Sequence, residues 1–376
     1  MANKKTRFLV IALMIVMSVS FLCDAHPRHA DSVQAGQVQY KKWTVSKPLL
    51  TAGPNDSFDN VAVKDPSIVF YNDNYHLFYT GKSSKQTSDG LKYDLDTGYV
   101  SAPTLEGLKS AKRYNFRDIV GEIVIAPQVF YFEPQQLWYL IGHTKVSGRP
   151  NLAPIYMTNP NIEDVQGWSK PKFLKTGKSN DEFWIDFWVI CDDTKAHLFY
   201  SDQKCAVLRM ECPIETFPQG LANAREQVSL HVEGEDDYGR WQMFEAEHVY
   251  HVKEPDKYLI ILECGYFEKA KNWYGDARRR FMIGMVANKL EGPWTRIEQS
   301  ENEYLAHASA LFNEDGTKSN YTQVSHPELI RCGYNQKLEI EDYNIQIMFQ
   351  SFDGSSTPDG YNYNELPWEL AVIKNF

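Results

Sequence analysis

Residues 66–80 read "PSIVFYNDNYHLFYT", and this stretch sets a pattern that returns along the chain. Two runs of β-branched and aromatic residues flank Asn72, Asp73 and Asn74, which form a cluster typical of turns. The segment therefore predicts a β-hairpin whose two strands meet at these three residues.

Four later segments repeat this plan. They are "PQVFYFEPQQLWYLIGHT" (127–144), "DFWVICDDTKAHLFYSD" (186–202), "EAEHVYHVKEPDKYLIILECG" (245–265) and "PELIRCGYNQKLEIEDYNIQIMFQS" (327–351). Their predicted turns fall at Glu133-Pro134, at Asp192-Asp193, between Lys253 and Asp256, and in a longer connection.

The hairpins recur at a regular distance. If Asp65, Pro127, Asp186, Glu245 and His326 head the five hairpins, the heads lie 62, 59, 59 and 81 residues apart. Repeating units of about 40–60 residues with several strands each are typical of β-propellers. A sandwich or jelly roll would show shorter and less even spacing. We predict an all-β, single-domain, five-bladed β-propeller over residues 41–376.

The N-terminus has the pattern of an export signal. The basic "MANKKTR" and the apolar "FLVIALMIVMSVSFL" precede "CDA", so residues 1–25 predict a signal peptide cleaved after Ala25. A membrane anchor is the rival reading, although the apolar run of about 15 residues is short for a span. Residues 26–40 are polar and predict a flexible leader. We expect a secreted protein, extracellular or periplasmic, with no later membrane span.

Composition excludes several classes of function. The chain has 376 residues, of which 43% are hydrophobic, and a formal net charge of -10. Because no basic block follows the N-terminus, we expect no nucleic-acid partner. Five cysteines follow Cys23, and their spacing fits no zinc site. Cys205 and Cys212 could pair, or all five could be free thiols. We expect a monomer.

Candidate catalytic residues stand at the predicted hairpin heads. The first strand of each propeller blade lines the central channel, so Asp65, Asp186, Glu245 and His326 should meet there. Burying an unpaired carboxylate is costly, so each needs a reason. One reading is structural, with the acids bonded to backbone groups or to Lys64 and similar cations. The other is chemical, because close carboxylates acquire different pKa values and so supply the acid and base that hydrolyse a glycosidic bond.

Several motifs together resemble one enzyme family. "VKDPSIVFYNDNYHLFY", "PQVFYFEPQQLWYL", "WIDFWVI", "FEAEHVY", "SHPELIRCGYNQKLEI" and "YNELPW" stand in order over roughly residues 41–376. They resemble glycoside hydrolase family 62, whose members are secreted arabinofuranosidases that act on arabinoxylan. The related family 43 shares the fold and the three carboxylates, but it matches the last two motifs poorly.

The resemblance implies an exo-acting α-L-arabinofuranosidase with an inverting mechanism. Asp65 would be the general base and Glu245 the general acid, while Asp186 would tune and orient the acid. In an inverting enzyme the acid and the base leave room for a water molecule, so the carboxyl groups of Asp65 and Glu245 should lie about 6.5–9.5 Å apart. The polysaccharide partner would be arabinoxylan or arabinan.

The resemblance also implies a sugar pocket and a metal. Lys64, Arg280 and Tyr363 would line the arabinose pocket. His326 would face the channel, where family members commonly hold a calcium ion largely through water. Alternatively, His326 forms a hydrogen bond with a neighbouring blade.

Some positions depart from the family pattern, and some alternatives stay open. Pro327, Asn335, Glu369 and the pair Phe187 and Trp188 replace residues more typical of the family, so the polymer recognised could differ. The alternatives are a carbohydrate-binding propeller without activity and a family 43-like arabinanase or xylosidase, including an endo-acting enzyme.

Glu247 would share a strand face with Glu245, because side chains of a strand alternate between its two faces. It could orient the acid, raise its pKa or reach bulk water.

Overall fold

The hairpin predicted over residues 66–80 is present in the computed structural model. Strand β3 (Ala62–Tyr71) pairs antiparallel with β4 (Asn74–Thr87). The turn residues Asn72 and Asp73 have φ angles of 49° and 60°. Two left-handed residues match a two-residue hairpin turn to the twist of its strands, and Asn and Asp tolerate that backbone.

The structure describes residues 39–40, 42–145, 152–175, 184–236, 239–266, 280–297, 303–355 and 363–375. The predicted signal peptide and almost all of the predicted leader lie outside these residues. Residues 38–376 form one compact unit, and the description below concerns it alone. Among the described residues, no helix combines the length and the apolar character needed to cross a membrane.

Five mainly antiparallel sheets form the five blades of the predicted propeller. Blades 1 to 3 each have four strands. From the inside outward, blade 1 has β3, β4, β5 (Gly90–Ala102) and β6 (Tyr114–Asn115), and blade 2 has β7 (Ile125–Phe132), β8 (Leu137–Lys145), β9 (Leu152–Asn159) and β10 (Lys172–Phe173). Blade 3 has β11 (Ile185–Cys191), β12 (Lys195–Ser201), β13 (Ala206–Pro213) and β14 (Gln227–His231).

Blades 4 and 5 carry extra strands. Blade 4 has β16 (Gly239–Val252), β17 (Lys257–Tyr266), β18 (Arg280–Ala287) and β19 (Thr295–Arg296), with β15 (Glu233–Asp236) and β23 (Glu339–Ile340) also paired to β16. Blade 5 has β22 (Ser325–Leu329), β24 (Ile347–Ser351), β25 (Glu369–Asn375), β2 (Trp43–Val45) and β21 (Leu311–Asn313).

The remaining elements are short. They are the strands β1 (Gln39–Tyr40) and β20 (Glu303–Tyr304), the helix α1 (Phe116–Val120), and the 3₁₀ turns Glu106–Ser110, Glu133–Gln135, Val165–Gly167, Ile214–Thr216, Gln219–Asn223, Ala308–Ala310 and Tyr363–Glu365.

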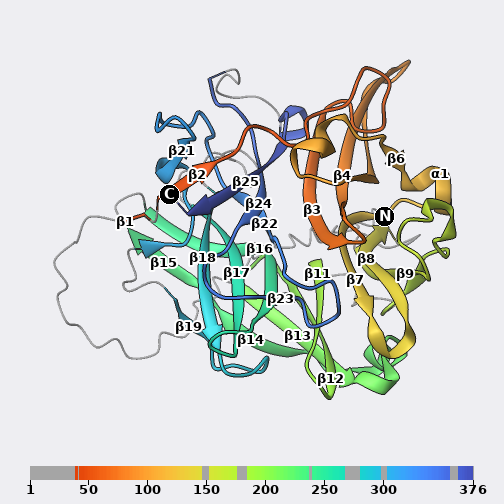
Figure 1. The fold of residues 1–376 in the computed structure, drawn as a ribbon, viewed down its shortest axis with the longest axis vertical. Helices are drawn as coiled ribbons and strands as arrows, with labels where there is room; N and C mark the ends of the chain where they lie inside the picture. The colour runs from red at the N-terminus through yellow and green to blue at the C-terminus, as the bar shows by residue number, and fades with distance from the viewer. Residues whose placement is uncertain are drawn as a thin grey trace, which may run out of the picture. The chain divides into compact units, whose positions relative to one another are not determined.

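Strand β2 closes the ring of blades. It comes from the N-terminal end of the described chain and pairs antiparallel with β25, which comes from the C-terminal end. Figure 1 shows β2 beside β25, and the innermost strands β3, β7, β11, β16 and β22 arranged about a common centre. Backbone hydrogen bonds between the two ends of the chain thus hold the first blade to the last.

Each innermost strand contains a β-bulge at the same place. The bulge residues have left-handed φ angles between 47° and 56°, and we call them the bulge ring: Asp65, Ala126, Asp186, Ala246 and His326. They lie 61, 60, 60 and 80 residues apart.

The bulge ring corrects two of the hairpin heads predicted from sequence. Pro127 and Glu245 are each one residue away from the true equivalents, Ala126 and Ala246. Glu245 instead matches Lys64, the residue before the bulge in blade 1. The alternation of apolar residues does not reveal where a bulge inserts its extra residue, so the prediction slipped by one position.

A second ring of side chains ties each blade to the next. We call it the second ring; it lies two residues beyond the bulge ring and consists of Ser67, Gln128, Trp188, His248 and Glu328. Each member bonds a backbone group of the following blade: Ser67 that of Val129, Gln128 that of Val189, Trp188 that of Val249, His248 that of Pro327 and Glu328 that of Ile68. The ring of hydrogen bonds is therefore closed.

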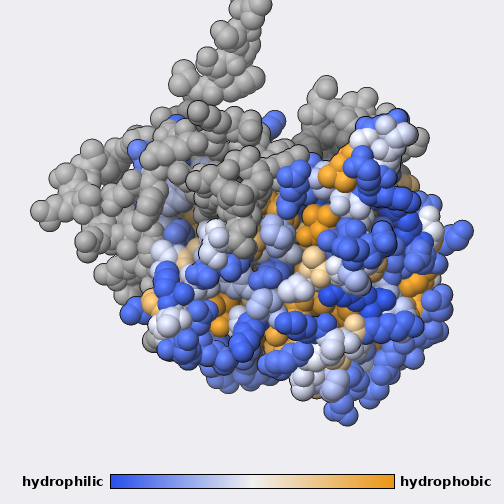
Figure 2. All heavy atoms as spheres, turned by 90° about the horizontal axis from the view of Figure 1, so that it is seen from above, coloured by the Kyte–Doolittle hydropathy of each residue, from blue (hydrophilic) through white to orange (hydrophobic). Residues whose placement is uncertain are grey.

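The cysteines take no part in this closure. All five that follow Cys23 are free thiols, so Cys205 and Cys212 are not paired. Over the face seen in Figure 2, hydrophilic side chains predominate, with small hydrophobic patches between them. Among the described residues, packing, hydrogen bonds and ion pairs hold the blades together, without disulfides.

Candidate active site

Three predicted site residues meet in the bulge ring. The Nδ1 atom of His326 lies 3.5 Å from Oδ1 of Asp65 and 3.9 Å from Oδ2 of Asp186. The Nζ atom of Lys64 lies 3.5 Å from Oδ1 of Asp65. These residues come from blades 1, 3 and 5, and a bulge commonly serves to re-aim a side chain beside a functional site.

Glu245 reaches the same centre from blade 4. Its Oε1 accepts a hydrogen bond of 2.8 Å from Nη1 of Arg280, and its Oε2 accepts one of 3.2 Å from Nε2 of Gln203. Its side chain is 15% exposed and that of Asp65 is 11% exposed. Both carboxyl groups are thus held in place while part of their surface stays open to a ligand.

The two aspartates of the bulge ring have opposite electrostatic surroundings. Burial would raise the pKa of Asp65, but the charges of Lys64 and His326 outweigh it and hold the pKa below its ordinary value. Burial raises the pKa of Asp186 well above its ordinary value, and Glu245 and Asp65 add to that effect. One bulge position thus favours an ionised carboxylate and the other a protonated carboxyl.

Glu263 joins this site, although the sequence did not single it out. It is fully buried on β17, where it pairs with Glu245 across the sheet. Its Oε1 accepts a hydrogen bond of 2.7 Å from Arg280, and its Oε2 accepts one of 2.7 Å from the backbone N–H of His326. Burial would lower the pKa of Arg280, but Glu263 and Glu245 outweigh it and raise that pKa.

The three predicted pocket residues lie together. The ring of Tyr363 has its centre 5.8 Å from Nζ of Lys64 and 5.8 Å from Cζ of Arg280. Lys82, which the sequence analysis missed, lies 5.4 Å from the same ring and donates a 2.8 Å hydrogen bond to Asn364. Burial, with Lys64 nearby, lowers the pKa of Lys82 to about 7. The register of the first hairpin could have found Lys82, because β4 runs beside β3.

Glu247 does not share a strand face with Glu245, so that expectation is wrong. Residues 245 and 248 pair with residues 263 and 261, so the bulge between them breaks the alternation. Glu247 is fully buried, and neither of its carboxyl oxygens has a hydrogen-bond partner among the described residues. Burial raises its pKa well above the ordinary value, and Asp186 and Glu245 add to that effect.

The other four blades show that the fold does not require a carboxyl group there. The positions that match Glu247 carry Pro66, Pro127, Phe187 and Pro327.

The surroundings of His326 fit a cation only if water supplies most of the ligands. Among the described residues, the one group of three ligand atoms within 4.8 Å of one another belongs to His197, Glu211 and Glu291, and it does not include His326. However, the Nδ1 atom of the buried His143 lacks a hydrogen-bond partner among the described residues. Ordered water commonly satisfies such an atom, so a hydrated cation suits this environment better than a direct protein cage.

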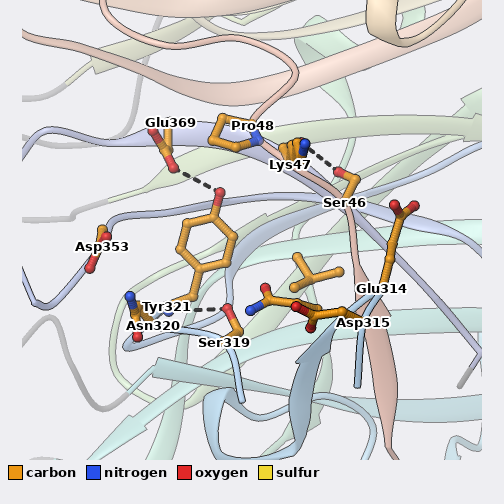
Figure 3. Close-up of a pocket in the computed structure, with 12 residues that line it drawn as sticks. Ser46, Lys47, Pro48, Glu314, Asp315, Ser319, Asn320, Tyr321, Asp353 and Glu369 are labelled. Carbon is orange, nitrogen blue, oxygen red and sulfur yellow. Dashed lines mark hydrogen bonds between the residues drawn. The ribbon is translucent and has the colours of Figure 1, made fainter. Parts of the chain in front are cut away.

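A cavity of about 530 Å³ lies elsewhere, on blade 5. Its lining includes Lys47, Asp353 and Glu369, and the hydroxyl of Tyr321 donates a 2.8 Å hydrogen bond to Glu369 (Figure 3). None of the predicted site residues lines it.

Comparisons with known proteins agree with one another. A family model described as "Glycosyl hydrolase family 62" matches residues 42–374. Alpha-L-arabinofuranosidase C of Cellvibrio japonicus (strain Ueda107) is 30% identical over 333 residues, which are 89% of this chain and 47% of that protein. The chain therefore spans about half the length of this curated relative.

Solved structures are similar as well. The catalytic domain of a family 62 α-L-arabinofuranosidase from Coprinopsis cinerea has a TM-score of 0.71 at 27% identity, over 89% of this chain and 96% of that chain. An α-L-arabinofuranosidase from Podospora anserina in complex with cellotriose has a TM-score of 0.69 at 27% identity, with the same coverage of both chains. A thermostable family 43 glycoside hydrolase, at 11% identity and a TM-score of 0.53, shares the fold alone.

Proposed function

The chain belongs to glycosyl hydrolase family 62, and we propose that it is an exo-acting α-L-arabinofuranosidase that removes arabinofuranosyl side chains from arabinoxylan by inverting hydrolysis. One observation carries this proposal. Asp65 and Glu245 come from different blades and lie around one partly open centre, where Asp65 lies beside Lys64 and His326 and Glu245 lies beside Arg280. Inverting glycosidases need two separated carboxyl groups of this kind.

Asp65 acts as the general base. The low pKa of its carboxyl group keeps it ionised beside Lys64 and His326. It takes a proton from a water molecule, and that water attacks the anomeric carbon of the arabinofuranosyl unit from the face opposite the leaving oxygen. The bond between the anomeric carbon and the xylan oxygen breaks as the new bond forms.

Glu245 acts as the general acid and gives its proton to the departing xylan oxygen. Arg280 and Gln203 orient its carboxyl group. Asp186 tunes and orients this acid, because its Oδ2 accepts a 3.2 Å hydrogen bond from the N–H of Ala246, directly after Glu245.

The sugar occupies the space bordered by Lys64, Arg280 and Tyr363. Lysine and arginine side chains can donate hydrogen bonds to the hydroxyl groups of a pentose, and a tyrosine ring can pack on the face of the sugar. Side chains that converge from several blades suit the binding of a terminal sugar, which is why we propose exo action.

His326 would hold a calcium ion in the channel, largely through water. Bound there, the ion would supply positive charge between the carboxylates and so stabilise the channel. We further propose that the chain is secreted, to the extracellular space or the periplasm, and acts on the polysaccharide as a monomer.

The deciding experiment identifies the sugar released. The protein is incubated with arabinoxylan, with arabinan and with unsubstituted xylan as the control, and the products are sized and followed by proton NMR from the first minutes. We expect free arabinose from arabinoxylan, with the β-anomer first, and no product from the control. Oligomeric products would instead indicate an endo-acting enzyme, and sugar binding without any product would indicate a binding module.

A further inference from the structure

A continuous line of buried hydrogen bonds joins the backbone of Asp65 to the carboxyl group of Glu245. It starts in blade 1, crosses blade 5 and ends in blade 4. The groups that form it, in order from Asp65, are the side chains of Gln350, Ser325, Glu263 and Arg280. All four residues are at most 6% exposed, so water hardly competes for these bonds.

Gln350 forms the first link. Its Oε1 accepts a 2.8 Å hydrogen bond from the N–H of Asp65, and its Nε2 donates a 3.0 Å bond to Oγ of Ser325. Asp65 has a left-handed φ of 49° on a bulge, where its N–H is not part of the regular strand ladder. Gln350, which belongs to blade 5, therefore stabilises a backbone position of blade 1 that lacks a partner in the sheet of blade 1.

Ser325 forms the central link. Its hydroxyl donates a 2.9 Å hydrogen bond to Oε1 of Glu263 and accepts a 3.0 Å bond from Nε2 of Gln350. One hydroxyl group thus joins the glutamine to the buried carboxylate. Arg280 then donates to both Glu263 and Glu245.

We propose that Gln350 and Ser325 are positioning residues that fix the separation between the carboxyl groups of Asp65 and Glu245. This inference rests on the proposed function. An inverting reaction requires a water molecule to fit between base and sugar, and a misplacement of about 1 Å can cost roughly 10²-fold in rate. Neither residue touches the reacting atoms; they act through the backbone of Asp65 and through Arg280.

The chain offers a matched control for Gln350. Gln128, in the second ring, is also a fully buried glutamine that joins two blades by two hydrogen bonds, of 2.8 and 2.7 Å, to the backbone of Val189. It bonds neither Asp65 nor Glu245. Replacing either glutamine by methionine removes two buried bonds with little change in volume, so the cost to stability should be similar.

The experiment compares Gln350→Met with Gln128→Met in the full chain. We expect similar losses in thermal stability. For Gln350→Met alone, we expect kcat on arabinoxylan to fall about tenfold or more while KM stays within about threefold. Ser325→Ala should lower kcat in the same way. If Gln350→Met keeps the kcat of Gln128→Met, the positioning role is wrong.

A second measurement does not depend on the substrate. Crystal structures of both variants would give the separation of the carboxyl groups of Asp65 and Glu245. We expect a change of more than about 0.5 Å in Gln350→Met and none in Gln128→Met. An unchanged separation in Gln350→Met overturns the inference, whereas a wild-type protein that releases no arabinose overturns the proposed function instead.

Discussion

The bulge ring and the second ring lie two residues apart on the same five strands, yet they differ in chemistry. In the bulge ring, the side chain of His326 lies within 4 Å of the titratable carboxyl groups of both Asp65 and Asp186. In the second ring, every side chain bonds the backbone of the next blade. One layer of the channel therefore holds the blades together, and the adjacent layer is free to carry reactive groups.

The backbone strain of the bulge ring belongs to the fold rather than to catalysis. Left-handed φ angles recur in all five blades, and two of the five residues are Ala126 and Ala246, which carry no reactive group. Strained backbone is often taken as a sign of function. Here the bulge is a repeated geometry, and the side chain placed on it decides whether a blade takes part in the chemistry.

The largest expected effect is the loss of turnover when Asp65 or Glu245 loses its carboxyl group. Asp65→Asn and Glu245→Gln should each lower kcat on arabinoxylan by about 10²–10⁴-fold, because each removes one acid or base. The free energy of unfolding should fall in Asp65→Asn, because the pKa of Asp65 lies below its ordinary value in the folded protein and the ionised carboxylate therefore stabilises the fold. Initial rates and urea unfolding measure the two effects.

A control for these variants is Asp193→Asn, on an exposed turn of blade 3. It should leave kcat unchanged. Wild-type rates in both Asp65→Asn and Glu245→Gln would show that the roles of general base and general acid have been assigned to the wrong residues.

In the second ring, the expected effect is on stability. Glu328 and Arg331 are both buried, and their side chains lie 3.2 Å apart. Glu328→Leu leaves the guanidinium group without its counter-charge and should lower the free energy of unfolding by about 3–5 kcal/mol. The molecules that remain folded should keep the wild-type kcat, as urea unfolding and active-site-normalised rates would show.

The double variant Glu328→Leu with Arg331→Met is the matched control, because it removes both charges together. It should recover much of the lost stability. A drop in kcat for the folded fraction of Glu328→Leu would contradict the separation of the two rings.

A smaller effect, this time a gain in stability, is expected at Glu247, which directly follows Ala246 of the bulge ring. Glu247→Met should raise the free energy of unfolding by about 1–3 kcal/mol, because it removes a buried carboxyl group without a hydrogen-bond partner among the described residues. Glu247→Gln should give less, since it stays polar. Thermal and urea unfolding test this; a less stable Glu247→Met variant would mean that the carboxyl group is satisfied in solution.

A last expected effect is on the pH dependence of stability. Burial lowers the pKa of His143 to about 3, although Asp65 opposes that shift. Between pH 3 and the ordinary value of about 6.5, the unfolded chain binds more protons, so stability should fall as the pH falls through this range. His143→Gln should show a shallower fall in urea unfolding between pH 7 and pH 4, and an unchanged slope would contradict the shift.

The sequence determined the repeat and placed several candidate residues in the central channel. Turn clusters and paired β-rich runs predicted five hairpins and five blades, because hairpins are local structures that short stretches specify. Asp65, Asp186 and His326 were found from their places in the repeat. Glu245 was selected by an interval that proved to be one residue off, since the bulge falls at Ala246, and by its motif.

Only the tertiary structure decided the bulge register and the contacts between blades. The hydrogen bond between Asp65 and Gln350 joins residues that are 285 positions apart in the sequence, and the bond between Ser325 and Glu263 joins residues 62 positions apart. Hydrophobic alternation specifies which face of a strand is buried, and it carries no information on which side chain of another blade a buried polar group will meet. The partners of Glu263 and Gln350, and the burial of Glu247 without a hydrogen-bond partner among the described residues, therefore follow from how the five blades close around one centre.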